Sequence, residues 1–130
     1  MHLKQSILAV AFFLAAPLFA IPLLSGLAEA GPADVVGVKV SKTAPNTYRF
    51  DVTVKHGDEG WDHYADRWDV VAPDGTVLGT RILHHPHVEE QPFTRSDVIK
   101  VPAGVTSVVV RAGDKVHGLG GAQMTVALPE

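Results

Sequence analysis

The stretch 83–93 is the densest group of chemistry-bearing residues in this chain. It contains His84, His85 and His87 within four positions, and two glutamates follow directly. Neutral imidazole nitrogens suit copper, zinc and nickel, and a nearby carboxylate can act as a further ligand or orient an imidazole through a hydrogen bond. The composition of this stretch therefore favours transition-metal binding.

Three more histidines lie in segments with the composition of loops. Because the 85–87 segment is extended and fixed by a proline, both of its outer histidines can turn toward one ion, while His84 points away. Histidines from separate loops can supply one coordination shell with an open position. We expect copper(II) or zinc as the ion, and the candidate ligands are His56, His63, His85, His87 and His117. Four carboxylates are candidates for ligands or orienting partners: Asp58, Asp62, Glu89 and Glu90.

Two other interpretations of these loops stay open. Trp61, Tyr64 and Phe93 flank the histidines, and aromatic residues are typical anchors of protein interfaces. The same loops could therefore bind a protein partner without any metal. In the third interpretation the histidines are structural, and they hold the loops by hydrogen bonds to backbone groups or to nearby carboxylates.

Strands must position these loops, because every strong hydrophobic pattern after residue 30 has a period of two. The pattern predicts seven strands and no helix, at about 35–42, 48–55, 66–72, 76–83, 95–101, 105–112 and 123–128. Seven short strands with regular turns indicate a single antiparallel β-sandwich. The order of hairpins and longer loops is similar to that of fibronectin type III and immunoglobulin-like domains.

Successive antiparallel strands place their connections alternately at two poles of a sandwich. The connections near residues 44–46, 73–75 and 102–104 are short turn formers without histidine. The other connections are longer, and together they carry all six histidines that follow residue 30. The strand order therefore predicts that these six histidines gather at one pole, where loops on a rigid scaffold commonly bind ligands.

The first thirty residues have the pattern of a signal peptide. A short basic start precedes an apolar run from Ile7 to Leu24, and Ala28-Glu29-Ala30 forms a small-residue cleavage motif. We expect cleavage to leave one domain, residues 31–130, in the periplasm or outside the cell. No second long apolar run exists, so we expect no membrane span in the mature chain.

Composition narrows the possible functions further. The chain has no cysteine, which excludes thiolate ligands, cysteine nucleophiles and disulfides. A net charge of −3 without any arginine-rich run disfavours nucleic acid as a partner. The glycines at 118–121 are followed by no helix, so they predict no phosphate loop and no organic cofactor. No nucleophilic triad is evident, so the sequence favours a binding protein over an enzyme, and only a metal-bound water would suit catalysis.

Three segments resemble a group of small exported bacterial proteins. They are Gly60–Asp66, His85–His87 and Gln91–Arg95. The resemblance spans the mature chain and implies an exported β-sandwich protein, and it implies no particular activity.

Overall fold

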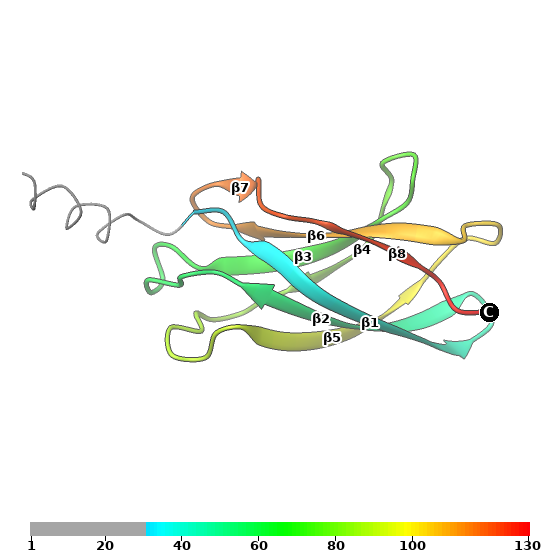
Figure 1. Ribbon diagram of the computed structural model, residues 1–130, viewed down its shortest axis with the longest axis horizontal. Helices are drawn as coiled ribbons and strands as arrows, with labels where there is room; N and C mark the ends of the chain where they lie inside the picture. The colour runs from blue at the N-terminus through cyan, green and yellow to red at the C-terminus, as the bar shows by residue number, and fades with distance from the viewer. Residues whose placement is uncertain (1–30) are drawn as a thin grey trace, which may run out of the picture.

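The computed structural model describes residues 31–130, which form two antiparallel sheets packed against each other (Figure 1). The expected signal peptide, residues 1–30, lies outside the described residues. No helix that could span a membrane is present among residues 31–130.

The two sheets divide the strands unevenly. The first sheet has the order β1-β2-β5, with β1 at Asp34–Ala44, β2 at Thr47–Lys55 and β5 at Phe93–Lys100. The second sheet is centred on β3, Ala65–Val71, and β6, Ser107–Asp114. β3 also pairs with β4, Val77–Ile82, and β6 also pairs with β7, Gly118–Leu119, and with β8, Met124–Ala127. All of these pairings are antiparallel.

The core lies between the sheets and is built by the alternating pattern of the strands. In β2, Tyr48, Phe50 and Val52 point inward and are buried, whereas the residues between them are more exposed. Trp68 and Val70 of β3 are fully buried opposite them. Burying one such side chain contributes roughly 1.5–3 kcal/mol, so this core is the rigid base from which the loops extend.

The predicted all-β antiparallel fold is confirmed, but the prediction was wrong about the end of β6. The structure has eight strands among the described residues, because the two-residue strand β7 returns along β6. β6 continues through Gly113 to Asp114, where the sequence suggested a loop. Gly113 opposes Arg67, and an added Cβ there would lie 2.9 Å from the Arg67 guanidinium. Because glycine is uncommon in strands, the pattern concealed this extension.

The three connections that carry histidines lie at one end of the sandwich (Figure 1). They are the β2–β3 loop, residues 56–64, the β4–β5 loop, residues 83–92, and the β6–β7 turn, residues 115–117. The connections of residues 45–46, 72–76 and 101–106 lie at the opposite end. All six histidines of residues 31–130 occur in the first three connections, and we call their end of the sandwich the histidine pole.

Candidate metal centre

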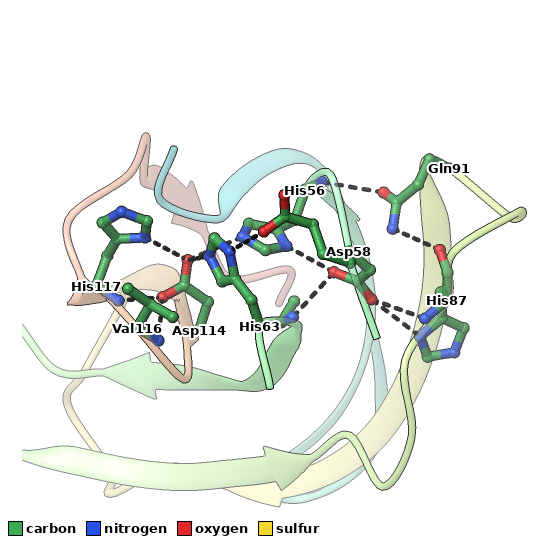
Figure 2. A network of polar contacts seen from close by, with 10 residues as sticks. His56, Asp58, His63, His87, Gln91, Asp114, Val116 and His117 are labelled. Carbon is green, nitrogen blue, oxygen red and sulfur yellow. Dashed lines mark hydrogen bonds and ion pairs between the residues drawn. The ribbon is translucent and has the colours of Figure 1, made fainter. Parts of the chain in front are cut away.

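Three histidine rings converge on one oxygen atom of Asp114 (Figure 2). From Asp114 Oδ2 the distances are 2.8 Å to His56 Nε2, 3.2 Å to His63 Nε2 and 2.9 Å to His117 Nδ1. The ligand atoms of His56, His63 and Asp114 all lie within 4.8 Å of one another, and these three residues are buried. The fold therefore groups three nitrogen donors and one oxygen donor, which we call the Asp114 cluster.

The backbone after β6 determines how the Asp114 carboxylate is oriented. Its Oδ1 accepts hydrogen bonds from the backbone N–H of Val116, at 3.0 Å, and of His117. Since Oδ1 is held by this turn, Oδ2 faces the histidine rings. Burial alone would raise the pKa of Asp114, but hydrogen bonds from His117 and His63 and the nearby His56 outweigh burial and lower this pKa to about 2. Asp114 therefore presents a fixed negative charge to the three rings.

His56 is held from its other side by a second buried carboxylate. Its Nδ1 lies 2.6 Å from Asp58 Oδ1, and both side chains are completely buried. Asp58 also accepts the backbone N–H of Ala65 at 3.0 Å and that of His87 at 2.7 Å. Asp58 thus orients His56 and joins the β2–β3 loop to β3 and to the β4–β5 loop.

His63 has an orienting carboxylate of a different kind. Its Nδ1 lies 2.6 Å from Glu59 Oε1, and the Glu59 side chain is 49% exposed. Burial alone would lower the pKa of His63, but the hydrogen bonds to Glu59 and Asp114 outweigh burial and raise this pKa above its usual 6.5. The two orienting carboxylates therefore differ, because Asp58 is buried and Glu59 is half exposed.

These contacts require either a proton on each facing ring nitrogen or a metal ion near Asp114 Oδ2. If Nδ1–H of His56 and of His63 donates to its orienting carboxylate, each neutral ring presents an Nε2 lone pair to the Asp114 oxygen. Buried acceptors that face one another are costly unless a proton or a metal ion lies between them. A histidine that donates its second N–H to a carboxylate is the usual arrangement around protein-bound metals. The group of His56, His63 and Asp114 can hold a metal ion, and His117 Nδ1 is a further donor 2.9 Å from Asp114 Oδ2.

The structure places the ring of His87 outside this cluster. The ring stacks on Phe93, with centroids 3.9 Å apart and planes at 9°. Arg95 Nη2 lies 2.9 Å from His87 Nε2, so the guanidinium donates to that lone pair. Burial, followed by the positive charge of Arg95 and the nearby His85, lowers the pKa of His87. Its Nδ1 is buried without a hydrogen-bond partner among residues 31–130, and it lies 4.0 Å from Asp58 Oδ2.

His85 also points elsewhere, so the two outer histidines of the 85–87 segment do not face a shared position at Asp114. The His85 ring is exposed, lies 4.6 Å from the His87 ring and contacts the Pro86 carbonyl oxygen at 3.1 Å. The dense histidine stretch contributes to the site through the backbone N–H of His87, which donates to Asp58. Gln91 adds a second link, because it accepts the His56 N–H at 3.0 Å and donates to the His87 carbonyl at 3.0 Å.

Sequence reasoning missed two carboxylates of the site. Asp114 lies three residues before His117, and Glu59 lies four residues before His63; these spacings were the available signal. Of the four candidate carboxylates, Asp58 contacts a ring of the cluster. Glu90 instead pairs with Arg95 at 3.3 Å.

The aromatic residues of the alternative interface differ in their exposure. Trp61 is 64% exposed and meets Tyr64 edge-on at 5.7 Å. Tyr64 and Phe93 are buried. Trp61 is therefore the one of the three that offers a side chain to a partner.

A sequence relative of this chain occurs in Halomicrobium mukohataei, where it is described as "Putative lipoprotein". It is 47% identical over 94 residues, which are 72% of this chain and 46% of the relative. The chain thus spans less than half the length of that protein. No protein-family model matches the sequence, and no solved structure matches it.

Proposed function

We propose that this chain is an exported protein that binds one divalent transition-metal ion, zinc or copper(II), at the Asp114 cluster. The observation that carries the proposal is the approach of three histidine nitrogens to one buried carboxylate oxygen. The carboxylates behind His56 and His63 support it, because a metal-binding imidazole commonly donates its second N–H to such a group. The proposed ligands are His56, His63, His117 and Asp114.

The distances within the cluster favour zinc over copper(II). In a square-planar copper(II) site, one of three nitrogens would lie opposite the oxygen, at about 4 Å from it. The three nitrogens of the cluster instead lie 2.8, 3.2 and 2.9 Å from Asp114 Oδ2. Tetrahedral zinc with bonds of about 2.0–2.1 Å would place all four donors roughly 3.3 Å apart. The three distances from Asp114 Oδ2 are therefore compatible with a tetrahedral ion. The ligand atoms that lie within 4.8 Å of one another belong to His56, His63 and Asp114, so the His117 ring would move closer to the other two rings to complete the shell.

Export and the finer fold assignment have their own support. The signal-peptide pattern of residues 1–30 and the printed name of the Halomicrobium mukohataei relative both favour an exported protein, in the periplasm or outside the cell. The pairing of the first, second and fifth strands in one sheet, against a sheet centred on the third and sixth, supports an immunoglobulin-like or fibronectin type III-like sandwich.

A contact surface for a protein partner is the second candidate function. It is supported by Trp61, which is 64% exposed, and by the exposed Val88 and Val116 on the other two connections of the histidine pole. Tryptophan is enriched among residues that dominate binding energies. A Trp61→Ala variant that loses a partner while it keeps its metal would separate this role from the first.

Metal analysis and calorimetric titration of residues 31–130 with zinc and with copper(II) test the metal proposal. We expect one zinc ion per chain, and we expect His56→Ala and His63→Ala to abolish tight binding. His84→Ala is the matched control, because His84 is an exposed histidine of the same pole without a place in the cluster. Binding that is absent, or that falls equally in all three variants, would overturn the proposal.

A further inference from the structure

We propose that His117 is the exchangeable ligand of the metal centre, and that a small neutral nitrogen donor from solvent can take its place on the bound ion. This inference rests on the proposed metal-binding function and deepens it. It assigns His56, His63 and Asp114 as the permanent ligands, and it gives the centre one replaceable position.

Exposure distinguishes His117 from the other two histidines. The side-chain exposure is 0% for His56, 8% for His63 and 34% for His117. Solvent therefore reaches the ring of His117, whereas protein atoms cover the other two. A molecule that approaches the ion from solvent meets His117 before it meets the other rings.

His117 also differs from His56 and His63 because no carboxylate holds the second nitrogen of its ring in Figure 2. Asp58 and Glu59 hold Nδ1 of His56 and of His63, so these two rings face Asp114 through Nε2. His117 faces Asp114 through Nδ1, and none of the residues drawn in Figure 2 forms a hydrogen bond with its Nε2. Withdrawal of the His117 ring would break its bond to the ion alone. Withdrawal of either other ring would also break a short hydrogen bond to a carboxylate.

The backbone of His117 is nevertheless fixed, so its ring can leave and return. The backbone N–H of His117 donates to Asp114 Oδ1. This is the carboxylate oxygen that does not face the rings. The three remaining donors would be two histidines and one carboxylate, a ligand set that commonly leaves positions open for an external ligand. Imidazole has the same donor chemistry as His117, and it is the natural probe of such a position.

Cobalt(II) reports this exchange, because its visible absorption spectrum changes with the number and type of its ligands. We would add one equivalent of cobalt(II) to wild-type protein, His117→Ala, His63→Ala and His56→Ala and then titrate each mixture with imidazole. We expect His117→Ala to keep one cobalt(II) ion with an altered spectrum, and imidazole to return that spectrum to the wild-type form. We expect no such recovery in His63→Ala or His56→Ala, because their rings are enclosed.

His117→Gln is a second variant that keeps most of the side-chain volume, and it should show the same recovery if His117→Ala fails to fold. Equal recovery by imidazole in the His63→Ala and His117→Ala proteins would overturn the inference. So would complete loss of cobalt(II) from both His117 variants, with no recovery by imidazole, while the wild type binds it. Failure of the wild-type protein to bind cobalt(II), zinc or copper(II) would instead overturn the metal centre itself.

Discussion

Asp58 Oδ1 lies 2.6 Å from His56 Nδ1, and both side chains are completely buried. The opposite nitrogen of the same ring lies 2.8 Å from Asp114 Oδ2. One imidazole therefore joins two buried carboxylates, and its orientation is fixed from both sides. Such a ring is ready to bind an ion without rearrangement, and its carboxylate partner should matter both to the fold and to metal affinity.

Asp58→Asn should therefore weaken zinc binding and destabilise the protein. Removal of a carboxylate that orients a metal-binding histidine typically costs 10–100-fold in metal affinity, and loss of one partner from a buried charged network costs about 3–5 kcal/mol. Calorimetry and urea unfolding measure the two effects. Glu59→Gln is the matched control: it also removes an orienting carboxylate, but a half-exposed one with a single ring contact, so it should lower affinity with little loss of stability. Equal stability of the two variants would contradict this account.

Asp114→Asn should abolish stoichiometric metal binding, because it removes the charge at the point where the three rings meet. Titration with zinc, followed by metal analysis after dialysis, measures this loss. Asp62→Asn is the comparison, because Asp62 is an exposed acid of the same pole whose side chain is not part of the cluster. Retention of one tightly bound ion in Asp114→Asn would show that the ion binds elsewhere.

The Asp114 cluster should stabilise the metal-free protein most at mildly acidic pH. The lowered pKa of Asp114, about 2 against 3.8, stabilises the fold above pH 3.8, and this contribution of about 2 kcal/mol is lost as the pH falls toward 2. The raised pKa of His63 acts at the other end: its contribution is complete below pH 6.5 and is lost as the pH rises through the folded-state value. The lowered pKa of His87 acts in the opposite direction between pH 5.5 and 8. Urea unfolding of the His87→Ala protein with a chelator present, at about pH 3, 5.5 and 8, should therefore give the highest stability at the middle pH.

Bound zinc should stabilise the protein more at alkaline pH than at acidic pH. Histidine must lose a proton to bind a metal, so metal affinity rises with pH. The stability gained on adding zinc should therefore be larger at pH 8 than at pH 5.5, although the Asp114 cluster stabilises the metal-free protein less at pH 8. The same unfolding series with saturating zinc measures this gain, and a gain independent of pH would show that the ion does not compete with protons at these rings.

His87→Ala should lower stability while metal affinity stays nearly unchanged. The variant loses the stacked contact with Phe93, and such aromatic pairs contribute about 0.5–1.5 kcal/mol beyond burial. It keeps the backbone N–H that donates to Asp58. His85→Ala, in the exposed neighbour, should change stability by no more than about 0.5 kcal/mol. A large loss of zinc affinity in either variant would place the 85–87 segment among the ligands.

The strands and the histidine pole could be predicted from the sequence, but the set of converging side chains could not. Alternation in segments such as 48–55 reports which face of a strand is buried, and the count of strands between loops then assigns each loop to a pole. Asp114 was concealed because Gly113 interrupts the pattern one position before the end of β6. The spacing of the 85–87 histidines also carries no information about Arg95, which is eight residues after His87 and turns that ring away from the cluster.

The two longest connections of the described residues, 56–64 and 83–92, lie at the same end of the sandwich, so its two ends are unequal. At the histidine pole, contacts among buried charged groups hold the loops together, whereas at the opposite end shorter connections join the strands. A domain without cysteine has no covalent link to secure its long loops, and a bound ion would take that part. Removal of the ion should then loosen this end first, through local opening rather than global unfolding. Chelators, rather than reducing agents, would make these loops sensitive to proteases.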